Sequence, residues 1–265
     1  GVVFQGHLDM VPQANSDANH DFVKDPIDAY VDGDWVTARG TTLGADNGMG
    51  VAAAMAVLAS KDIAHGPVEG LFTIDEETGM TGAMKLDPSN FEGTILLNLD
   101  TEDDDELSIG CAGGIDTNTS YSYALEDIKS DSVVYEISIK GLLGGHSGMD
   151  IDKGRGNANK LMTRILFKLK SEVEFQLISF DGGSLRNAIP REATSIIAFS
   201  NSDKSKVETI VNDFISLLKF ELKTVENHLV ITFHNTTSND KAIVKNDFIK
   251  IINTLYSAPN GVFRM

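Results

Sequence analysis

The stretch that decides the fold is Leu71-Phe72-Thr73-Ile74-Asp75-Glu76-Glu77-Thr78-Gly79. It begins as an apolar, β-branched run, which is typical of a buried strand, and it ends in three acidic residues and a glycine. Carboxylates at the end of a buried strand cost free energy unless a positive charge lies nearby. A metal ion supplies such a charge, and two adjacent carboxylates can then divide the work between metal binding and proton transfer. We therefore expect the rest of the chain to bring partners to Glu76 and Glu77.

Composition limits the class of protein. The length of 265 residues is enough for one large domain or two ordinary ones, and 23% charged residues is typical of a globular protein. The net charge of −17 argues against nucleic acid or an anionic membrane as a partner. No apolar run reaches the roughly 18 residues of a membrane-spanning helix. The single cysteine, Cys111, suits a reducing compartment, so we expect a cytoplasmic enzyme.

The first half of the chain alternates continuous apolar strands with helices. The expected strands of the sheet are 2–10, 68–74 and 94–99, a short hairpin piece is expected at 35–38 within a long loop, and the expected helices are 49–60 and 79–86. The strand at 94–99 is mostly apolar and is expected to be buried. This alternation predicts an α/β layer in which helices cover both faces of a sheet.

After Gly113-Gly114 the pattern changes to half-exposed strands. Apolar and polar residues alternate in these strands, and a helical stripe of apolar residues runs from Val207 to Leu218. The expected order is strand 133–139, helix 157–172, strands 174–180 and 193–199, helix 207–218 and strand 228–234. This β-α-β-β-α-β order is ferredoxin-like, so we expect a second domain to begin near residue 114. Because the chain starts inside a strand-like run and stops after a turn signal, we also expect it to be part of a longer protein.

Polar residues gather at the ends of the expected elements of the first half. They are His7 and Asp9 after the first strand, Asp46 at a helix start, Glu76 and Glu77 after the second strand, and Asp100 after the third. If the strands are parallel, their carboxyl ends share the edge of the sheet where ligands bind. One histidine with several carboxylates suits zinc, and also manganese or cobalt. The His-x-Asp spacing places Asp9 on the same side of the strand as His7, where it can hold the ring.

Each of these features has a simpler explanation when it is taken alone. A single histidine is more often a buried side chain with a hydrogen bond than a metal ligand. Asp46-Asn47-Gly48 is typical of a turn and helix cap, and acids at 75–77 and 100 are typical of solvated strand ends. The joint case for a metal site is stronger, because all of these features fall at the ends of expected elements.

Several motifs together resemble those of one family. They are Gly6-His7-Leu8-Asp9-Met10-Val11-Pro12, Gly44-Ala45-Asp46-Asn47-Gly48, Asp75-Glu76-Glu77-Thr78-Gly79, Asn98-Leu99-Asp100, Gly110-Cys111-Ala112-Gly113-Gly114, Lys140-Gly141-Leu142-Leu143-Gly144-Gly145-His146-Ser147-Gly148 and Leu185-Arg186-Asn187-Ala188-Ile189-Pro190-Arg191-Glu192-Ala193. The chain resembles the dinuclear zinc exopeptidases related to aminoacylases and glutamate carboxypeptidases. Within that group it is most similar to the aminoacyl-histidine dipeptidases (Xaa-His dipeptidase, peptidase D), and the resemblance runs from Gly1 to about Met265.

The resemblance implies two divalent metal ions, with Zn²⁺ expected and Co²⁺ or Mn²⁺ as alternatives. His7 and Asp100 would bind one ion, Glu77 would bind the other, and Asp46 would bridge the two. Glu76 would be the general base, and Asp9 would support His7. The last metal ligand of the family, a histidine near the C-terminus, is not in this stretch, so we expect the stretch by itself to be inactive.

The resemblance also implies a domain organisation. Residues 1–113 would be part of a zinc-exopeptidase-like α/β catalytic domain that binds metal, and residues 114–265 part of a ferredoxin-like α+β lid and dimerisation domain. The glycines around His146 let the backbone turn sharply near a ligand, although this segment alone is equally typical of an exposed turn. By resemblance, His146 would donate to the oxyanion and Asn187 would hold the carboxylate end of the substrate. Because ferredoxin-like lids often pair edge to edge, we expect a homodimer through the lid domain.

The sequence therefore predicts a metallopeptidase that hydrolyses dipeptides, of the Xaa-His type by resemblance. A water shared by two metal ions would attack the scissile carbonyl, with Glu76 taking its proton. Two alternatives stay open, namely an N-acyl amino acid deacylase with the same metal site and a non-catalytic dimerisation or binding domain. The non-catalytic alternative is disfavoured because every proposed metal position carries a ligating side chain. The expected partners are a small peptide substrate and a second copy of the chain, with no nucleic acid and no membrane.

Overall fold

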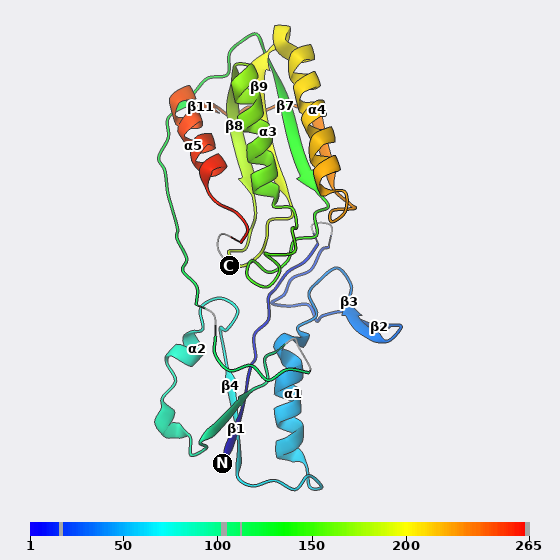
Figure 1. Cartoon of the computed structure of the whole chain (residues 1–265), viewed down its shortest axis with the longest axis vertical. Coiled ribbons are helices and arrows are strands. Elements are labelled where there is room, and N and C mark those ends of the chain that lie inside the picture. The colour runs from blue at the N-terminus through cyan, green and yellow to red at the C-terminus, as the bar shows by residue number, and fades with distance from the viewer. Residues whose placement is uncertain (16–17, 102–104, 112, 263–265) are drawn as a thin grey trace. The chain divides into compact units, whose positions relative to one another are not determined.

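Figure 1 shows a computed structural model of the chain, which describes residues 1–15, 18–101, 105–111 and 113–262. The chain divides into two compact units, Gly1–Ala112 and Gly113–Met265, and the sheets lie within them. The predicted fold class, an α/β unit followed by a ferredoxin-like α+β unit, is confirmed. Within the described ranges, no helix is both long enough and apolar enough to cross a membrane.

The first unit is built on a parallel three-stranded sheet with the order β4-β1-β5. The central strand β1 (Val2–His7) pairs with β4 (Val68–Thr73) on one side and with β5 (Ile95–Asn98) on the other. All three strands therefore end at the same edge of the sheet, which meets the condition under which the sequence predicted that the site residues converge. His7 ends β1 directly beside Thr73 of β4, so the residues that follow these strands are neighbours.

Helix α1 (Ala45–Ala59) packs close to β1 because its contacts involve very small residues. A Cβ atom on Gly50 would lie 2.5 Å from the main-chain oxygen of Leu99, and one on Gly6 would lie 2.4 Å from Oδ1 of Asn47. Only glycine allows both approaches, so these two positions bring the start of α1 against the strand ends. The remaining elements of this unit are the hairpin β2 (Ala29–Asp32) and β3 (Trp35–Ala38), helix α2 (Thr81–Met84) and the 3₁₀ turn η1 (Pro88–Asn90).

Strand β5 forms where it was predicted, but the expectation that it is buried is wrong. Ile95, Leu96 and Leu97 are 55%, 57% and 41% exposed. The reason is topological: among the described residues, β5 pairs with β1 on one side only, and helix α1 packs against β1 and β4. An apolar run thus indicated a strand but not its place in the sheet.

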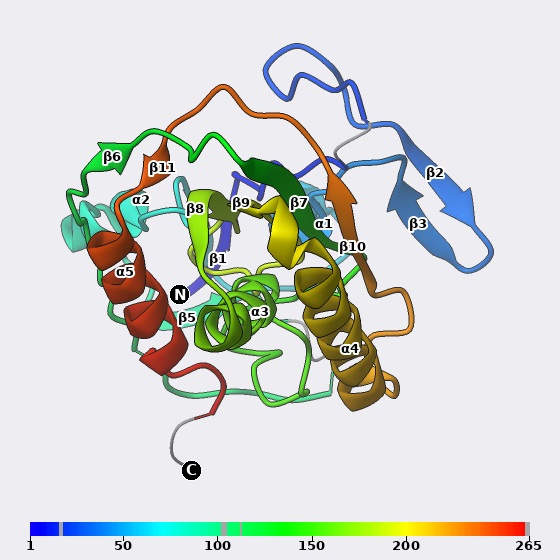
Figure 2. The same ribbon diagram turned by 90° about the horizontal axis from the view of Figure 1, so that it is seen from above.

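The second unit contains a six-stranded antiparallel sheet with the order β10-β7-β9-β8-β11-β6. Its elements are β6 (Leu125–Glu126), β7 (Ser132–Lys140), α3 (Ala158–Glu172), β8 (Phe175–Gly182), β9 (Ala193–Ser200), η2 (Asn201–Asp203), α4 (Lys204–Leu222), β10 (Val230–Asn235), β11 (Ala242–Ile243) and α5 (Lys245–Ser257). The order β10-β7-β9-β8, with helices α3 and α4 in the crossovers, is the predicted ferredoxin-like core. Figure 2 shows α3, α4 and α5 on one face of this sheet.

The main hydrophobic core lies between that sheet face and the helices. Ile137 of β7, Leu166 of α3 and Ile197 of β9 are fully buried members of one cluster. Helix α3 begins at Asn157, whose side chain accepts a hydrogen bond from the main-chain N–H of Lys160, as an N-cap residue does. The loop between β7 and α3 leaves this rigid core and carries His146.

Candidate metal centre

His7 is almost completely buried at the end of β1, with 1% of its side chain exposed. Its Nδ1 atom lies 2.8 Å from the main-chain oxygen of Asp9. Because a carbonyl oxygen can only accept a hydrogen bond, Nδ1 carries a proton and donates it. The lone pair of the neutral ring is therefore on Nε2, which is the usual arrangement for a metal-ligating histidine.

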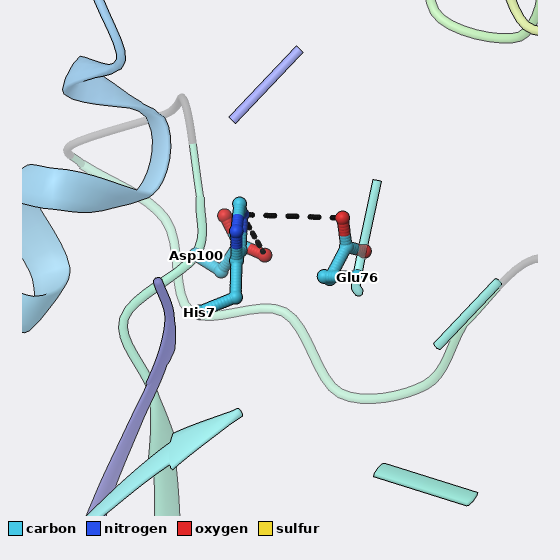
Figure 3. A group of neighbouring side chains, drawn as sticks. All are labelled: His7, Glu76 and Asp100. Atoms are coloured by element: carbon cyan, nitrogen blue, oxygen red, sulfur yellow. Dashed lines mark ion pairs between the residues drawn. The ribbon is translucent and has the colours of Figure 1, made fainter. Parts of the chain in front are cut away.

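The Nε2 atom of His7 faces carboxylates from three other segments. It lies 3.1 Å from Oδ1 of Asp46, 3.7 Å from Oδ2 of Asp100 and 3.9 Å from Oε2 of Glu76. Figure 3 shows the ion-pair lines from His7 to Asp100 and Glu76. The structure thus brings together residues from the ends of β1, β4 and β5 and the start of α1.

Two sets of three residues have ligand atoms that all lie within 4.8 Å of one another. One set is His7, Glu76 and Asp100, and the other is His7, Asp46 and Glu77. The adjacent residues Glu76 and Glu77 therefore belong to different sets. Glu76, predicted as the general base rather than a ligand, lies within reach of a cation held by His7 and Asp100. The division of roles between the two glutamates stays a prediction.

Asp9 supports the site in a different way from the one expected. The His7 ring donates its hydrogen bond to the main-chain oxygen of Asp9, whereas the carboxylate Oδ1 of Asp9 lies 3.6 Å from Nδ1. The carboxylate instead accepts from the main-chain N–H groups of Glu76 (3.2 Å) and Glu77 (3.1 Å). Although burial opposes it, these N–H groups hold the pKa of Asp9 below its usual value. Asp9 therefore fixes the backbone of both glutamates relative to β1.

Asp75, the first acid of the stretch that follows β4, is outside both three-residue sets and organises the turn. Its φ angle of +60° is unusual for a residue other than glycine. Its side chain accepts hydrogen bonds from the hydroxyls of Thr78 and Thr81, the latter at 2.6 Å. The turn is therefore held from inside by Asp75 and from β1 by Asp9.

Asn47 is a residue of the site to which the sequence reasoning assigned no role. Asn47 is 5% exposed, and its Oδ1 accepts a hydrogen bond from the main-chain N–H of His7 at 3.3 Å. Its Nδ2 donates to the main-chain oxygen of Leu99 at 2.8 Å and to Oδ1 of Asp100 at 3.0 Å. Asn47 thus joins α1 to the ends of β1 and β5. In the sequence, only the neighbouring Asp46 pointed to a role for Asn47. Asp-Asn-Gly by itself is equally typical of a turn.

The crowding of negative charge changes the protonation of the group. Burial and the charge of Asp46 raise the pKa of Asp100 to about 6, and burial with Asp46 and Glu76 raises the pKa of Glu77. Burial opposes protonation of His7, but Asp100 and Asp46 raise the pKa of its ring nonetheless. A divalent cation would relieve this repulsion. The donor set of one imidazole nitrogen and several carboxylate oxygens therefore fits such an ion.

These shifts predict how the stability of the metal-free protein depends on pH. Because the pKa of Asp100 is raised in the folded state, protonation of Asp100 stabilises the folded protein. This stabilisation is complete below pH 3.8 and is lost as the pH rises through about 6. We expect Asp100 alone to lower the free energy of unfolding by about 1 kcal/mol between about pH 5 and pH 7.5. Urea unfolding after chelator treatment measures this, and Asp100→Asn should flatten the slope. A metal-free protein that is more stable at the higher pH would contradict the expectation.

A cavity of about 190 Å³ lies in the first unit beside this group. Glu76 and Asp100 line it together with polar Gln5, Thr73 and Asn98 and apolar side chains from β4, β5 and the segment that contains α2. The two carboxylates therefore border a space that is large enough for water and small polar groups.

The two predicted residues of the second unit are brought together by a short backbone pairing. His146 forms an isolated antiparallel bridge with Ala188, and the main-chain N–H of Ser147 donates to the main-chain oxygen of Asn187 at 2.8 Å. His146 is exposed and Asn187 is half-buried. Within this unit, the loop after β7 and the loop before β9 therefore present His146 and Asn187 side by side.

Comparison with known proteins identifies relatives of the whole chain. Residues 137–226 match the peptidase dimerisation domain family. The chain is 46% identical to the cytosol non-specific dipeptidase of Escherichia coli (strain K12), an alignment that covers 99% of the chain and 54% of the relative. It is 48% identical to the crystal structure of aminoacylhistidine dipeptidase from Vibrio alginolyticus, with a TM-score of 0.68, covering 100% of this chain and 54% of that one.

The matched regions include the sequence motifs both before and after residue 114. The chain spans about half the length of both relatives. The alignment covers nearly all of the chain, so it spans both the first unit, which contains the carboxylate group, and the ferredoxin-like core of the second unit. Over nearly its whole length, the chain is therefore similar to about half of each of these two proteins, and its residues 137–226 match the peptidase dimerisation domain family.

Proposed function

We propose that the protein containing this chain is a metal-dependent dipeptidase. The observation that carries the proposal is the convergence of His7 with Asp46, Glu76, Glu77 and Asp100 at the carboxyl ends of parallel strands. A buried imidazole surrounded by three half-buried carboxylates and the exposed Asp46 is costly without a cation, and the group has the ligand chemistry of hydrolytic metal sites. The names of the two dipeptidases at 46% and 48% identity support the same reaction.

The proposed site holds two divalent ions, with Zn²⁺ favoured and Co²⁺ or Mn²⁺ as alternatives. His7 and Asp100 would bind one ion, Glu77 the other, and Asp46 both. Divalent ions at such a site lower the pKa of water and polarise a carbonyl group. Glu76 takes a proton from the attacking water and passes it to the leaving amine. Asp9 holds the main chain of Glu76 in place while the carboxylate moves that proton.

The proposed substrates are dipeptides, including those with C-terminal histidine. One relative is named an aminoacylhistidine dipeptidase and the other a non-specific dipeptidase, so we propose that Xaa-His dipeptides are accepted without being exclusive. In the second unit, His146 would donate to the oxyanion and Asn187 would hold the carboxylate end of the substrate. Deacylation of N-acyl amino acids uses the same bond chemistry, but neither relative's name supports it.

We further propose that the protein is a homodimer in the cytoplasm and that the second unit makes the dimer contact. The match of residues 137–226 to a peptidase dimerisation domain supports the dimer. The word cytosol in the name of the Escherichia coli relative supports the location. The net charge of −17 is consistent with the expectation that nucleic acid and anionic membranes are not partners.

The proposal is tested by assaying the full-length, metal-loaded protein on Xaa-His dipeptides, other dipeptides and N-acetyl amino acids. We expect hydrolysis of both dipeptide classes, with kcat/KM at least about tenfold above that for acyl substrates, or about 1.4 kcal/mol of barrier. The Glu76→Gln protein, purified in the same way, controls for contaminating peptidases. Activity on acyl substrates alone would make the protein a deacylase. No hydrolysis at full metal content would leave the binding-domain alternative.

A further inference from the structure

A buried carboxylate in the second unit lies outside the proposed metal site. Glu226, in the connection between α4 and β10, is 4% exposed. Its Oε2 accepts from the main-chain N–H of Leu143 at 2.8 Å, and its Oε1 accepts from the main-chain N–H of Gly156 at 2.7 Å. A buried carboxylate is costly unless it is hydrogen-bonded, and bonds to an ionised acceptor are stronger than neutral ones. Glu226 therefore uses both oxygens to hold two distant points of the backbone together.

Those two points are the ends of the loop that carries His146, which we call the histidine loop (residues 143–156). The loop is closed tightly at its base. A Cβ atom on Gly156 would lie 2.7 Å from Cδ2 of the buried Leu142 and 3.4 Å from Oε1 of Glu226. The close approach of the two loop ends thus depends on a glycine at one end and on Glu226 between them.

Further hydrogen bonds connect the base of the histidine loop to His146. The guanidinium of Arg155 donates to the main-chain oxygen of Gly144 at 2.7 Å and lies 3.2 Å from Oδ2 of Asp150. That same Oδ2 accepts from the main-chain N–H of His146 at 2.7 Å, and the N–H of Asp150 donates to the main-chain oxygen of His146 at 3.0 Å. The backbone of His146 is therefore linked to the closed base through Arg155 and Asp150.

The loop also determines the tautomer of the His146 ring. The main-chain N–H groups of Gly148 and Met149 both point at Nδ1, each at 3.1 Å. Because an amide N–H can only donate, Nδ1 must be the unprotonated nitrogen that accepts. In the neutral ring the proton is then on Nε2, and the His146 residue is exposed. The loop thus presents a fixed N–H donor, which is what stabilisation of an oxyanion needs.

We propose that Glu226 is a positioning residue that, by closing the histidine loop, holds His146 in its Nε2–H tautomer and directs that donor outward. Its effect on catalysis rests on the proposed dipeptidase function, whereas its effect on the ring does not. A buried acid that served only the stability of the unit would leave the ring tautomer unaffected when its charge was removed. Glu221 offers a matched control. It accepts hydrogen bonds from Arg164 of α3, at 2.8 and 2.9 Å, and not from the main chain of the histidine loop.

The first test is spectroscopic and needs no substrate. ¹⁵N-histidine NMR of the full-length protein should show His146 with an unprotonated Nδ1 and a protonated Nε2, and His146→Ala assigns the signal by its loss. In Glu226→Gln, the amide NH₂ must face one of the two main-chain donors, so the loop base opens and the signal should move toward a mixture of tautomers. Glu221→Gln should leave it in place. An unchanged His146 signal in folded Glu226→Gln would overturn the proposal.

The second test is a double-mutant cycle on the same protein. Glu226→Gln should lower kcat for a dipeptide about tenfold, with KM and metal content unchanged, because the donor acts in the transition state. In the His146→Ala background the same substitution should have no further effect on kcat. Additive effects would show that Glu226 acts independently of His146 and would also overturn the proposal.

Two safeguards separate the possible outcomes. If Glu226→Gln does not fold, Gly156→Ala takes its place with the same criteria, because its added methyl group opens the loop base from the other side. If the full-length protein hydrolyses no dipeptide, the proposed function fails, and the NMR comparison still decides whether Glu226 sets the tautomer of His146.

Discussion

Glu76→Gln in the full-length protein is expected to lower kcat by roughly 10²- to 10⁴-fold while both metal ions stay bound. Glutamine keeps the size of the side chain and the hydrogen bond from its main-chain N–H to Asp9, but it cannot take a proton. Glu77→Gln is expected to act differently, by weakening metal binding, because Glu77 is grouped with His7 and Asp46. Steady-state kinetics together with elemental analysis of dialysed protein separates the two effects.

The geometry makes this comparison a strict test of the roles. Oε2 of Glu76 lies 3.9 Å from Nε2 of His7, close enough for Glu76 to share a cation with His7 and Asp100. If both variants lose metal equally, Glu76 is a ligand and the assignment of a general base is refuted. Asp75→Asn, on the same turn but outside both three-residue sets, is the control for simple disturbance of the turn.

His146→Ala is expected to lower kcat by about 10²-fold or more, with metal content unchanged, because that is the usual effect of losing one oxyanion donor. The ring is exposed, and its Nδ1 is occupied by the N–H groups of Gly148 and Met149. Removing the ring therefore removes an outward-facing donor and leaves the buried core of the second unit intact. Kinetics at saturating dipeptide and the thermal midpoint measure both quantities, and unchanged kcat would exclude His146 from the reaction.

Mixing His146→Ala with Glu76→Gln tests whether His146 acts within its own chain or on a partner chain. If it acts across subunits, each heterodimer has one site lacking both groups and one site with both. Activity should then reappear after mixing, in proportion to the heterodimers formed. Proven subunit exchange without recovery would assign His146 to the site of its own chain.

The sequence alone predicted the local structure well because local patterns determine it. Apolar β-branched runs indicated β1 and β4, and the alternating and helical patterns after residue 114 indicated the ferredoxin-like order. The sequence also indicated that His7 and Asp100 would meet if the strands were parallel, since the ends of parallel strands lie at one edge of a sheet. That inference needed only the order of the elements and their direction.

Contacts between distant parts of the chain were decided by the tertiary structure. Asp9 binds the main chain 67 and 68 residues away, Asn47 reaches Asp100 across 53 residues, and Glu226 reaches Leu143 across 83. No local pattern encodes such partners, because each is a polar side chain that satisfies backbone or carboxylate groups only after the segments have packed. The exposure of β5 likewise follows from its place at the edge of the sheet that the described residues form. The sequence by itself thus determined which residues are candidates for the chemistry, and the packing determined which atoms hold them, because hydrogen-bond partners depend on distances that only the folded chain creates.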